Sequence, residues 1–160
     1  MIDGVDQPAE EKNGGKLRDF ASWRMSRVDL DEVIEWLIGR LAKVYPGKTK
    51  TEILGWLRGV CESNEYLFIR SSRALALVQI VQEPLLPPRA EERFVFAMDG
   101  GKEHAAALYH DIKRWCVNTG LDEYVISRAT DIDEGRIESR MGKVNTYALK
   151  FVASPLPAIQ

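Results

Sequence analysis

The spacing of apolar residues changes repeatedly along the chain, and the order of these changes restricts the fold more than any other feature of the sequence. Spacings of three and four residues predict amphipathic helices, whereas alternating or short continuous apolar runs predict strands. These patterns predict strands over 20–28, 66–69, 74–81, 93–98, 124–127 and 146–152, and helices over 29–43, 49–61, 102–119 and 133–141. Helices interspersed among strands in this order are typical of an α/β domain.

Short motifs mark where several of these segments begin and end. Two pairs have the three-residue spacing of a capping box and predict helix starts: Asp29 with Glu32, and Thr49 with Glu52. Gly120 stands where a left-handed residue ends a helix. Three prolines within 83–92 prevent regular structure and predict a loop there.

Length and charge exclude several classes of protein. The 160 residues (18.1 kDa) suffice for one domain with a substantial core, without disulfides or metals. The balance of 22 Lys+Arg against 24 Asp+Glu excludes a globally basic nucleic-acid-binding protein, so we expect no nucleic-acid partner. No apolar run approaches the roughly 18 residues of a membrane span, so we expect a soluble protein with no membrane contact.

Composition also divides the chain into a domain and two tails. Residues 1–18 are polar and contain almost nothing apolar, which predicts a flexible tail with no secretory signal. We expect the folded domain at 19–153 and a short tail at 154–160. Cys61 and Cys116 lie on apolar helical patterns, which favours buried thiols and a reducing, cytoplasmic location.

The order of the elements, with two local features, resembles a known family. The features are the segment 94–126, a buried strand followed by a glycine turn, an Ala-containing helix and a short strand, and Met141-Gly142-Lys143 before the last strand. Over about residues 20–152 the chain resembles the GNAT-type N-acetyltransferases. The resemblance implies a single-domain GNAT-like fold, with a mixed, mostly antiparallel central sheet and helices on both faces, and it implies acetyl-CoA as cofactor.

The resemblance also implies where the cofactor binds. In the family, the backbone before the third helix positions the thioester, and the glycine turn with the helix start holds the pyrophosphate, because a helix N-terminus attracts anions. The residues at these positions are Ala97, Met98, Gly100, Gly101, Lys102 and Ala105. The glycines, Lys102 and Ala105 are equally those of an ordinary turn and helix start.

Other residues give no defined catalytic or metal site. Glu103 stands where the family's phosphate motif has its first glycine, and Glu138 stands where the family has its usual acid, a tyrosine. Asp99 is either a base toward an amine or, twice as often for such an Asp, a helix cap. His104 and His110 are six residues apart and lie on different helix faces, so they form no metal pair. The catalytic residue is therefore unassigned, and we expect no metal.

Two functions remain open at this point. The first is transfer of an acetyl group from acetyl-CoA to an amine on a small molecule or a protein. The second is a catalytically inactive GNAT-like module that binds a protein partner, which the substitutions at Glu103 and Glu138 favour. Compact bacteriophage chains of this style, including podovirus internal virion proteins, are similar and imply a virion or host-interaction role.

Overall fold

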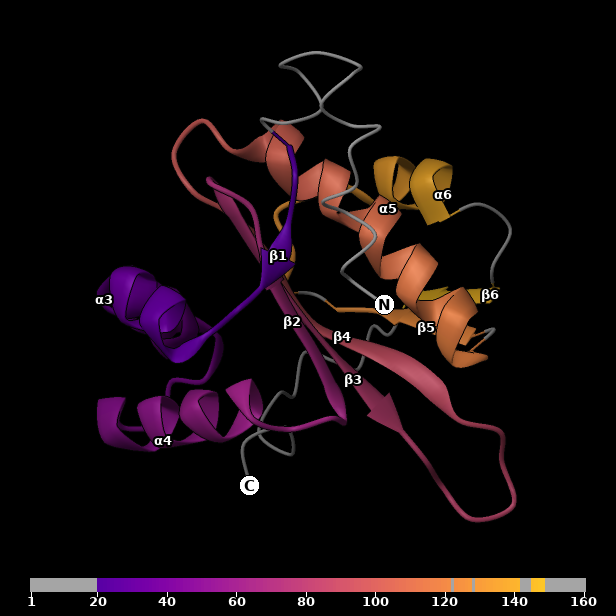
Figure 1. Ribbon diagram of the computed structural model, residues 1–160, viewed down its shortest axis with the longest axis horizontal. Coiled ribbons are helices and arrows are strands. Elements are labelled where there is room, and N and C mark those ends of the chain that lie inside the picture. The colour runs from indigo at the N-terminus through magenta and orange to yellow at the C-terminus, as the bar shows by residue number, and fades with distance from the viewer. Residues whose placement is uncertain (1–19, 122, 128, 142–144, 149–160) are drawn as a thin grey trace.

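The computed structural model describes residues 20–121, 123–127, 129–141 and 145–148 (Figure 1). The two predicted tails, Gly142, and residues 149–152 of the predicted last strand lie outside the described residues. The elements in chain order are β1 (Trp23–Arg24), α3 (Arg27–Val44), α4 (Lys50–Cys61), β2 (Tyr66–Arg70), β3 (Ala74–Val81), β4 (Arg89–Ala97), α5 (Lys102–Thr119), β5 (Glu123–Ile126), α6 (Glu134–Met141) and β6 (Asn145–Ala148).

Local motifs account for several helix boundaries. The predicted box at α4 is confirmed, because Thr49 Oγ1 accepts from Glu52 N (3.1 Å) and Glu52 Oε1 accepts from Thr49 N (2.9 Å). The prediction that α3 begins at Asp29 is wrong. Asp29 is instead the third residue of a box capped by Ser26, so the helix begins at Arg27 and the predicted first strand shortens to two residues. Gly120 ends α5 with φ +80, as predicted.

The six described strands form one sheet in the order of the sequence, β1-β2-β3-β4-β5-β6. The pairs from β1 to β4 are antiparallel, whereas β4–β5 and β5–β6 are parallel. The parallel pair β4–β5 has only two registered residue pairs, Ala90 with Tyr124 and Glu91 with Val125. The sheet is therefore mixed and mostly antiparallel, and β4 lies at the change of direction.

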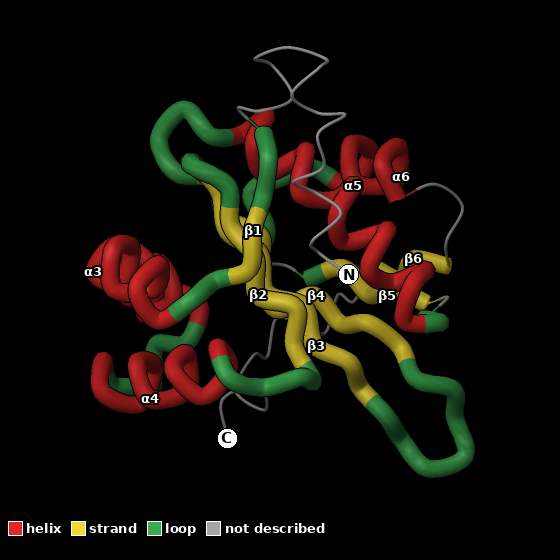
Figure 2. The backbone as a smooth tube through the Cα atoms, in the orientation of Figure 1, coloured by secondary structure: helices red, strands yellow, loops and turns green. Residues whose placement is uncertain are grey.

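Helices cover both faces of the sheet, as the tube in Figure 2 illustrates. On one face, α3 and α4 pack against a cluster that includes Leu37, Leu57, Phe94 and Phe96. On the other face, α5 and α6 pack against a second cluster that includes Ile112. Continuous apolar runs in the central strands follow from this arrangement, because both faces of β4 are buried.

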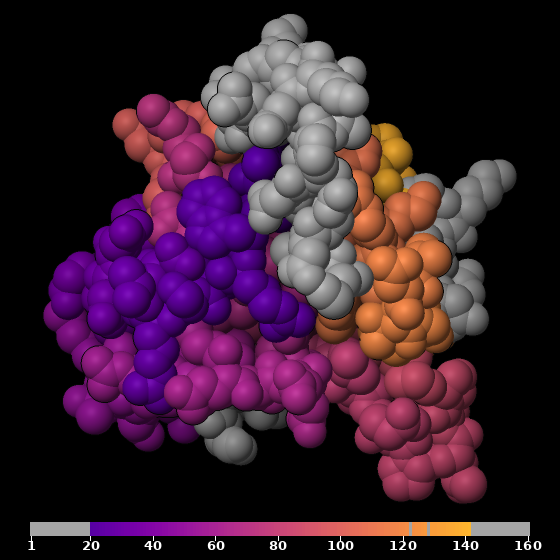
Figure 3. Space-filling view, in the orientation of Figure 1, coloured from indigo at the N-terminus to yellow at the C-terminus, as the bar shows by residue number. Residues whose placement is uncertain are grey.

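Strand β4 is longer than predicted. Residues 89–92 were expected in the proline loop, yet they pair with β3 from Val81 to Val78 and belong to the strand. The prolines end at 88, so each of these four residues keeps an N–H for the ladder. The resulting β3–β4 hairpin projects from the body of the molecule (Figure 3). Midway along β3, between Leu77 and Val78, the register of its pairing with β4 shifts.

Candidate functional site

The cofactor residues predicted from the sequence lie together where β4 ends and α5 begins. Backbone N–H groups along a strand point alternately to its two neighbours. Ala97 N–H points away from β3. Met98 N–H points toward β3 and donates to the carbonyl oxygen of Arg73 (2.8 Å), the residue just before that strand. Of these two residues, Ala97 therefore offers its N–H on the side of β5.

Gly100 and Gly101 build the tight turn between β4 and α5. Gly101 N–H donates to Met98 O (2.7 Å), and Gly100 has φ +72, a value that non-glycine residues rarely adopt. A Cβ on Gly101 would lie 2.1 Å from Arg73 O. Close packing against the β2–β3 turn therefore requires glycine at position 101, whatever else the turn binds.

The start of α5 combines a glycine N-cap with a lysine at the first helical position. Its N-cap, Gly101, has no side chain to accept a hydrogen bond from the first turn. Lys102 is exposed at the first helical position, and Ala105 is buried with its N–H donating to Gly101 O (2.8 Å). Glu103 pairs with Arg136 of α6 (2.7 Å), which offsets its negative charge. The helix start therefore keeps the electrostatics that attract an anion.

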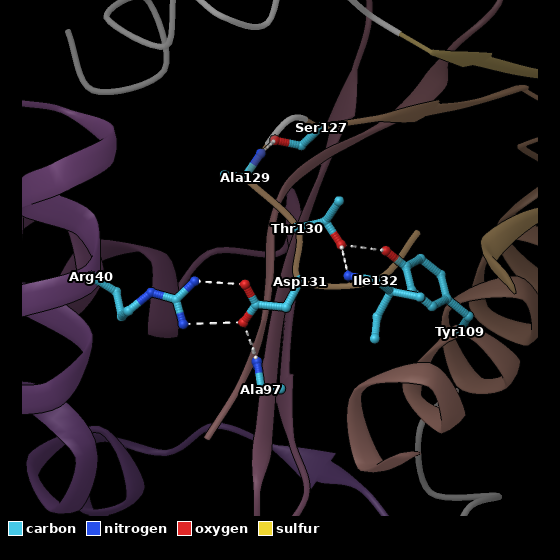
Figure 4. A network of polar contacts seen from close by, with 8 residues as sticks. All are labelled: Arg40, Ala97, Tyr109, Ser127, Ala129, Thr130, Asp131 and Ile132. Atoms are coloured by element: carbon cyan, nitrogen blue, oxygen red, sulfur yellow. Dashed lines mark hydrogen bonds and ion pairs between the residues drawn. The ribbon is translucent and has the colours of Figure 1, made fainter. Parts of the chain in front are cut away.

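Residues 129–131, which we call the strap, occupy the edge of β4 that faces β5 (Figure 4). Val95 N–H donates to Ala129 O (3.0 Å), and Asp131 N–H donates to Val95 O (2.9 Å). One step further along β4, Ala97 N–H donates to the Asp131 carboxylate (2.7 Å). Beyond the short β4–β5 ladder, the strap thus takes the donors of Val95 and Ala97.

Side chains tie the strap to the helices on both faces of the sheet, as Figure 4 shows. On one side, Arg40 of α3 binds the Asp131 carboxylate with two hydrogen bonds, of 2.7 and 3.0 Å. The Arg40 guanidinium also lies 4.2 Å from the centre of the Phe96 ring. On the other side, Thr130 Oγ1 lies 3.2 Å from Tyr109 OH of α5. The strap is held at both of its faces.

The buried carboxyl group of Glu92 lies beside Ser127, just before the strap. Glu92 accepts hydrogen bonds from Tyr124 OH (2.6 Å), Tyr109 OH (2.8 Å) and Ser127 N–H (3.3 Å). Burial raises the pKa of Glu92 to about 7 despite these three donors. Burial, with the Glu92 charge, also raises the pKa of both tyrosines well above the usual value. Glu92 therefore titrates near neutral pH and the tyrosines stay protonated.

The sequence did not single out Glu92, Arg40 or Asp131. The only signal for the Glu92 cluster was two tyrosines in apolar segments, because a buried tyrosine hydroxyl needs a partner. Nothing in the sequence paired either with Glu92, which was expected in a loop. Arg40 and Asp131 are 91 residues apart and become neighbours only through the sheet.

The structure also places the other residues that the sequence singled out. Asp99 is not the cap of α5, because Gly101 takes that position, and Asp99 O accepts from Arg73 Nη1 (3.0 Å). Glu138 is exposed on α6. His104 lies against the Phe20 ring, 4.8 Å between ring centres. Burial raises the pKa of Cys116 to about 12, so its thiol is not a ready nucleophile.

Within the described part of the chain, no three His, Cys, Asp or Glu residues are placed to hold a metal ion. None of the helices that the structure describes has both the length and the apolar character needed to cross a membrane.

Comparison with solved structures assigns the fold. The aminoglycoside antibiotic 6'-N-acetyltransferase AAC(6')-IG from Acinetobacter haemolyticus superposes with a TM-score of 0.55 at 10% identity, covering 80% of this chain and 93% of its own. Aminoglycoside N-acetyltransferase AAC(6')-Iy, in complex with CoA, gives a TM-score of 0.52 at 15% identity, covering 76% and 85%. The chain has the GNAT fold.

No protein-family model matches the sequence, and no curated protein matches it. At 10% and 15% identity, the two GNAT-fold neighbours establish the architecture and leave the activity open. The expected fold class, a single α/β domain with a mixed sheet and helices on both faces, is confirmed. The bacteriophage resemblance stays a prediction.

Proposed function

We propose that the protein transfers an acetyl group from acetyl-CoA to an amine. The observation that carries this proposal is the run of backbone groups along one edge of β4, Val95 N–H, Val95 O and Ala97 N–H, which leads toward the uncapped start of α5. The fold supports the same function, since both neighbours are named N-acetyltransferases and one was solved with CoA.

The chemistry of this edge fits the pantetheine arm of CoA. That arm is an extended chain with two amide groups, and the strap that now lies on the edge is itself an amide chain. Ala129 O and Asp131 N–H satisfy Val95 in the way that a ligand's amide oxygen and N–H would. Beyond the edge, the α5 start with Lys102 fits the phosphates. Binding in this position requires the strap to leave β4.

The residues of the chain would contribute mainly by positioning. Bound acetyl-CoA would supply the acetyl group, with Ala97 N–H as the donor for the acyl oxygen once Asp131 has withdrawn. A fixed backbone donor at that place stabilises negative charge that develops on the oxygen. Holding the amine in line with the thioester provides the other part of the rate, without a covalent enzyme intermediate. Gly100, Gly101, Met98 and Ala105 would shape the turn that leads to the phosphates.

A second function is favoured by one observation, the strap itself. If residues 129–131 stay on β4, its edge has no donor left for a cofactor, and the protein is a GNAT-fold module that binds a protein partner. A virion or host-interaction role belongs to this second function. The acceptor under the first function is an amine-bearing small molecule, such as an aminoglycoside, or a protein amine.

Acetyl-CoA binding and thiol release test the proposed function. Titration calorimetry with acetyl-CoA should give a saturable heat, and an aminoglycoside, a polyamine and a peptide with a free N-terminus serve as acceptors. Lys102→Glu should weaken acetyl-CoA binding by about fivefold or more, because it reverses a charge at the anion site. The control is Lys50→Glu, the same change at the exposed first residue of α4. Absence of acetyl-CoA binding, both in the wild type and in variants that free the β4 edge from residues 129–131, would reject acetyl transfer in favour of the module.

A further inference from the structure

The strap imitates an extended amide ligand on β4. A carbonyl oxygen (Ala129), an N–H (Asp131) and a second oxygen (the Asp131 carboxylate) meet three successive polar groups on the β5 side of the strand. Regular β4–β5 pairing ends at Glu91 and Val125, so the strap is bound to β4 mainly by these contacts and by its side chains. The same groups would hold a ligand's amide chain.

We propose that the strap is a built-in competitor for the acetyl-CoA site, fixed by the Arg40–Asp131 ion pair and displaced when acetyl-CoA binds. This inference rests on the proposed function and adds its regulation. Only one chain at a time can donate to Val95 O and accept from Val95 N–H and Ala97 N–H, so strap and ligand exclude each other. Apparent affinity is then the intrinsic affinity multiplied by the fraction of molecules with the strap released.

Asp131 is the residue on which the closed arrangement depends most. Its carboxylate accepts both from Ala97 N–H and from Arg40, and its N–H donates to Val95 O. Arg40 is held in place by stacking on Phe96, with Trp36 at 5.5 Å, so the guanidinium has a defined position on α3 with which to hold the carboxylate. Side chains of both partners reach solvent in part, at 31% for Arg40 and 24% for Asp131. The pair can therefore separate into water without unfolding the core.

Titration of strap variants with acetyl-CoA tests this competition. Asp131→Ala removes the acceptor of Ala97 N–H and the partner of Arg40, and we expect it to raise the affinity for acetyl-CoA by about tenfold. Arg40→Gln leaves the contact to Ala97 in place and should raise the affinity by less. Glu62→Ala is the matched control, since it removes a carboxylate from an ion pair of the same 2.7 Å length, to Arg27, away from β4.

A second probe distinguishes strap release from a general loosening of the fold. The phosphorylated ADP half of CoA lacks pantetheine, so under this inference it would bind without reaching the β4 edge. Its affinity should be equal in the wild type and in Asp131→Ala, whereas a distorted fold would change both affinities. Amide hydrogen exchange on the full chain adds a direct readout: saturating acetyl-CoA should speed exchange of Asp131 N–H and leave Val95 and Ala97 N–H protected.

The outcomes separate this inference from the proposed function. Equal acetyl-CoA affinity in the wild type, Asp131→Ala and Arg40→Gln would overturn the competition and leave acetyl-CoA binding intact. Continued protection of Asp131 N–H in the ligand-saturated protein would overturn it as well, because the ligand would then bind elsewhere. Absence of acetyl-CoA binding in every variant, with Arg40→Gln still folded, would reject both the inference and the function on which it rests.

Discussion

Glu92 is a buried residue whose raised pKa predicts a change of stability between acid and neutral pH. Burial raises its pKa from 4.5 to about 7, so the folded state binds the proton more tightly than the unfolded chain does. The stabilisation by the protonated group is complete below about pH 4.5 and is lost as pH rises through about 7. Relative to Glu92→Gln, the wild-type free energy of unfolding should fall by about 3 kcal/mol over this range.

Urea unfolding at a series of pH values measures this difference. The comparison between wild type and Glu92→Gln cancels the titration of the other carboxyl groups. Glu62→Gln, which removes an exposed carboxyl group, should leave the wild-type pH profile nearly parallel. A wild type whose stability relative to Glu92→Gln stays flat between pH 4.5 and 7 would contradict the raised pKa.

Leu85 is strained at the tip of the β3–β4 hairpin. It has φ +70 and is fully exposed, and Leu86 N–H donates to Glu83 O (3.2 Å) across the turn. Glycine tolerates this conformation, while a leucine there costs about 1–2 kcal/mol. After the entropy of an added glycine, Leu85→Gly should raise the free energy of unfolding by about 0.5–1 kcal/mol.

Thermal unfolding of Leu85→Gly beside Leu86→Gly checks this prediction. Leu86 also lies exposed at the tip and has no positive φ, so its replacement brings glycine entropy without relief of strain. We expect Leu86→Gly to be neutral or destabilising. A lower melting temperature for Leu85→Gly than for the wild type would show that the turn is not strained.

At the scale of the elements, Gly59 and Gly101 should respond in opposite directions to replacement by alanine. Gly59 lies exposed inside α4, and an added Cβ would contact nothing within 4 Å. Gly59→Ala should therefore stabilise the protein by about 1 kcal/mol through helix propensity. Gly101→Ala should destabilise it by more than that, because the Cβ would collide with Arg73 O of the backbone. Thermal melts of both variants test the pair, and equal shifts would contradict this assignment.

Elements whose boundaries depend on neighbouring residues could be predicted from the sequence. The α4 capping box, the left-handed end of α5 at Gly120 and strand 74–81 all lie where the local pattern placed them. The α3 start was misplaced by two residues because two residue pairs have the spacing of a capping box. These pairs are Ser26 with Asp29, which forms the box, and Asp29 with Glu32, which the sequence favoured.

The site was less predictable because distant segments form it. The β4 end and the turn at Gly100 follow from the local pattern, and the sequence placed the turn correctly and the strand end within one residue. Occupation of the β4 edge by the strap depends on hydrogen bonds between residues more than 30 apart, and no local pattern encodes these. Glu92 was lost in a proline-rich segment because strand pairing with β3 outweighed the loop composition.

At the scale of the whole molecule, one sheet joins two cores. Leu57 belongs to the cluster under α3 and α4, and Ile112 to the cluster under α5, and both are fully buried. Truncation of either to alanine should cost about 2–5 kcal/mol through lost burial and a cavity. Because both cores share the strands, each variant should still unfold in one cooperative transition.

Coincident unfolding curves from far-ultraviolet circular dichroism and tryptophan fluorescence would establish that single transition. The matched comparison is Leu86→Ala, which removes an exposed leucine from the hairpin tip and should change the unfolding free energy little. Two separated transitions in Leu57→Ala or Ile112→Ala would mean that the two faces fold independently.

The agreement between strand order and sequence order has a consequence for how the chain leaves the ribosome. Every fully buried member of the cluster under α3 and α4 lies between Met25 and Phe96. That half of the protein can close while α5 and the strap are still being synthesised, since it needs none of their side chains in its centre. The emerging intermediate would present β4 with its far edge open, so the rest of the chain arrives at a template that is already folded.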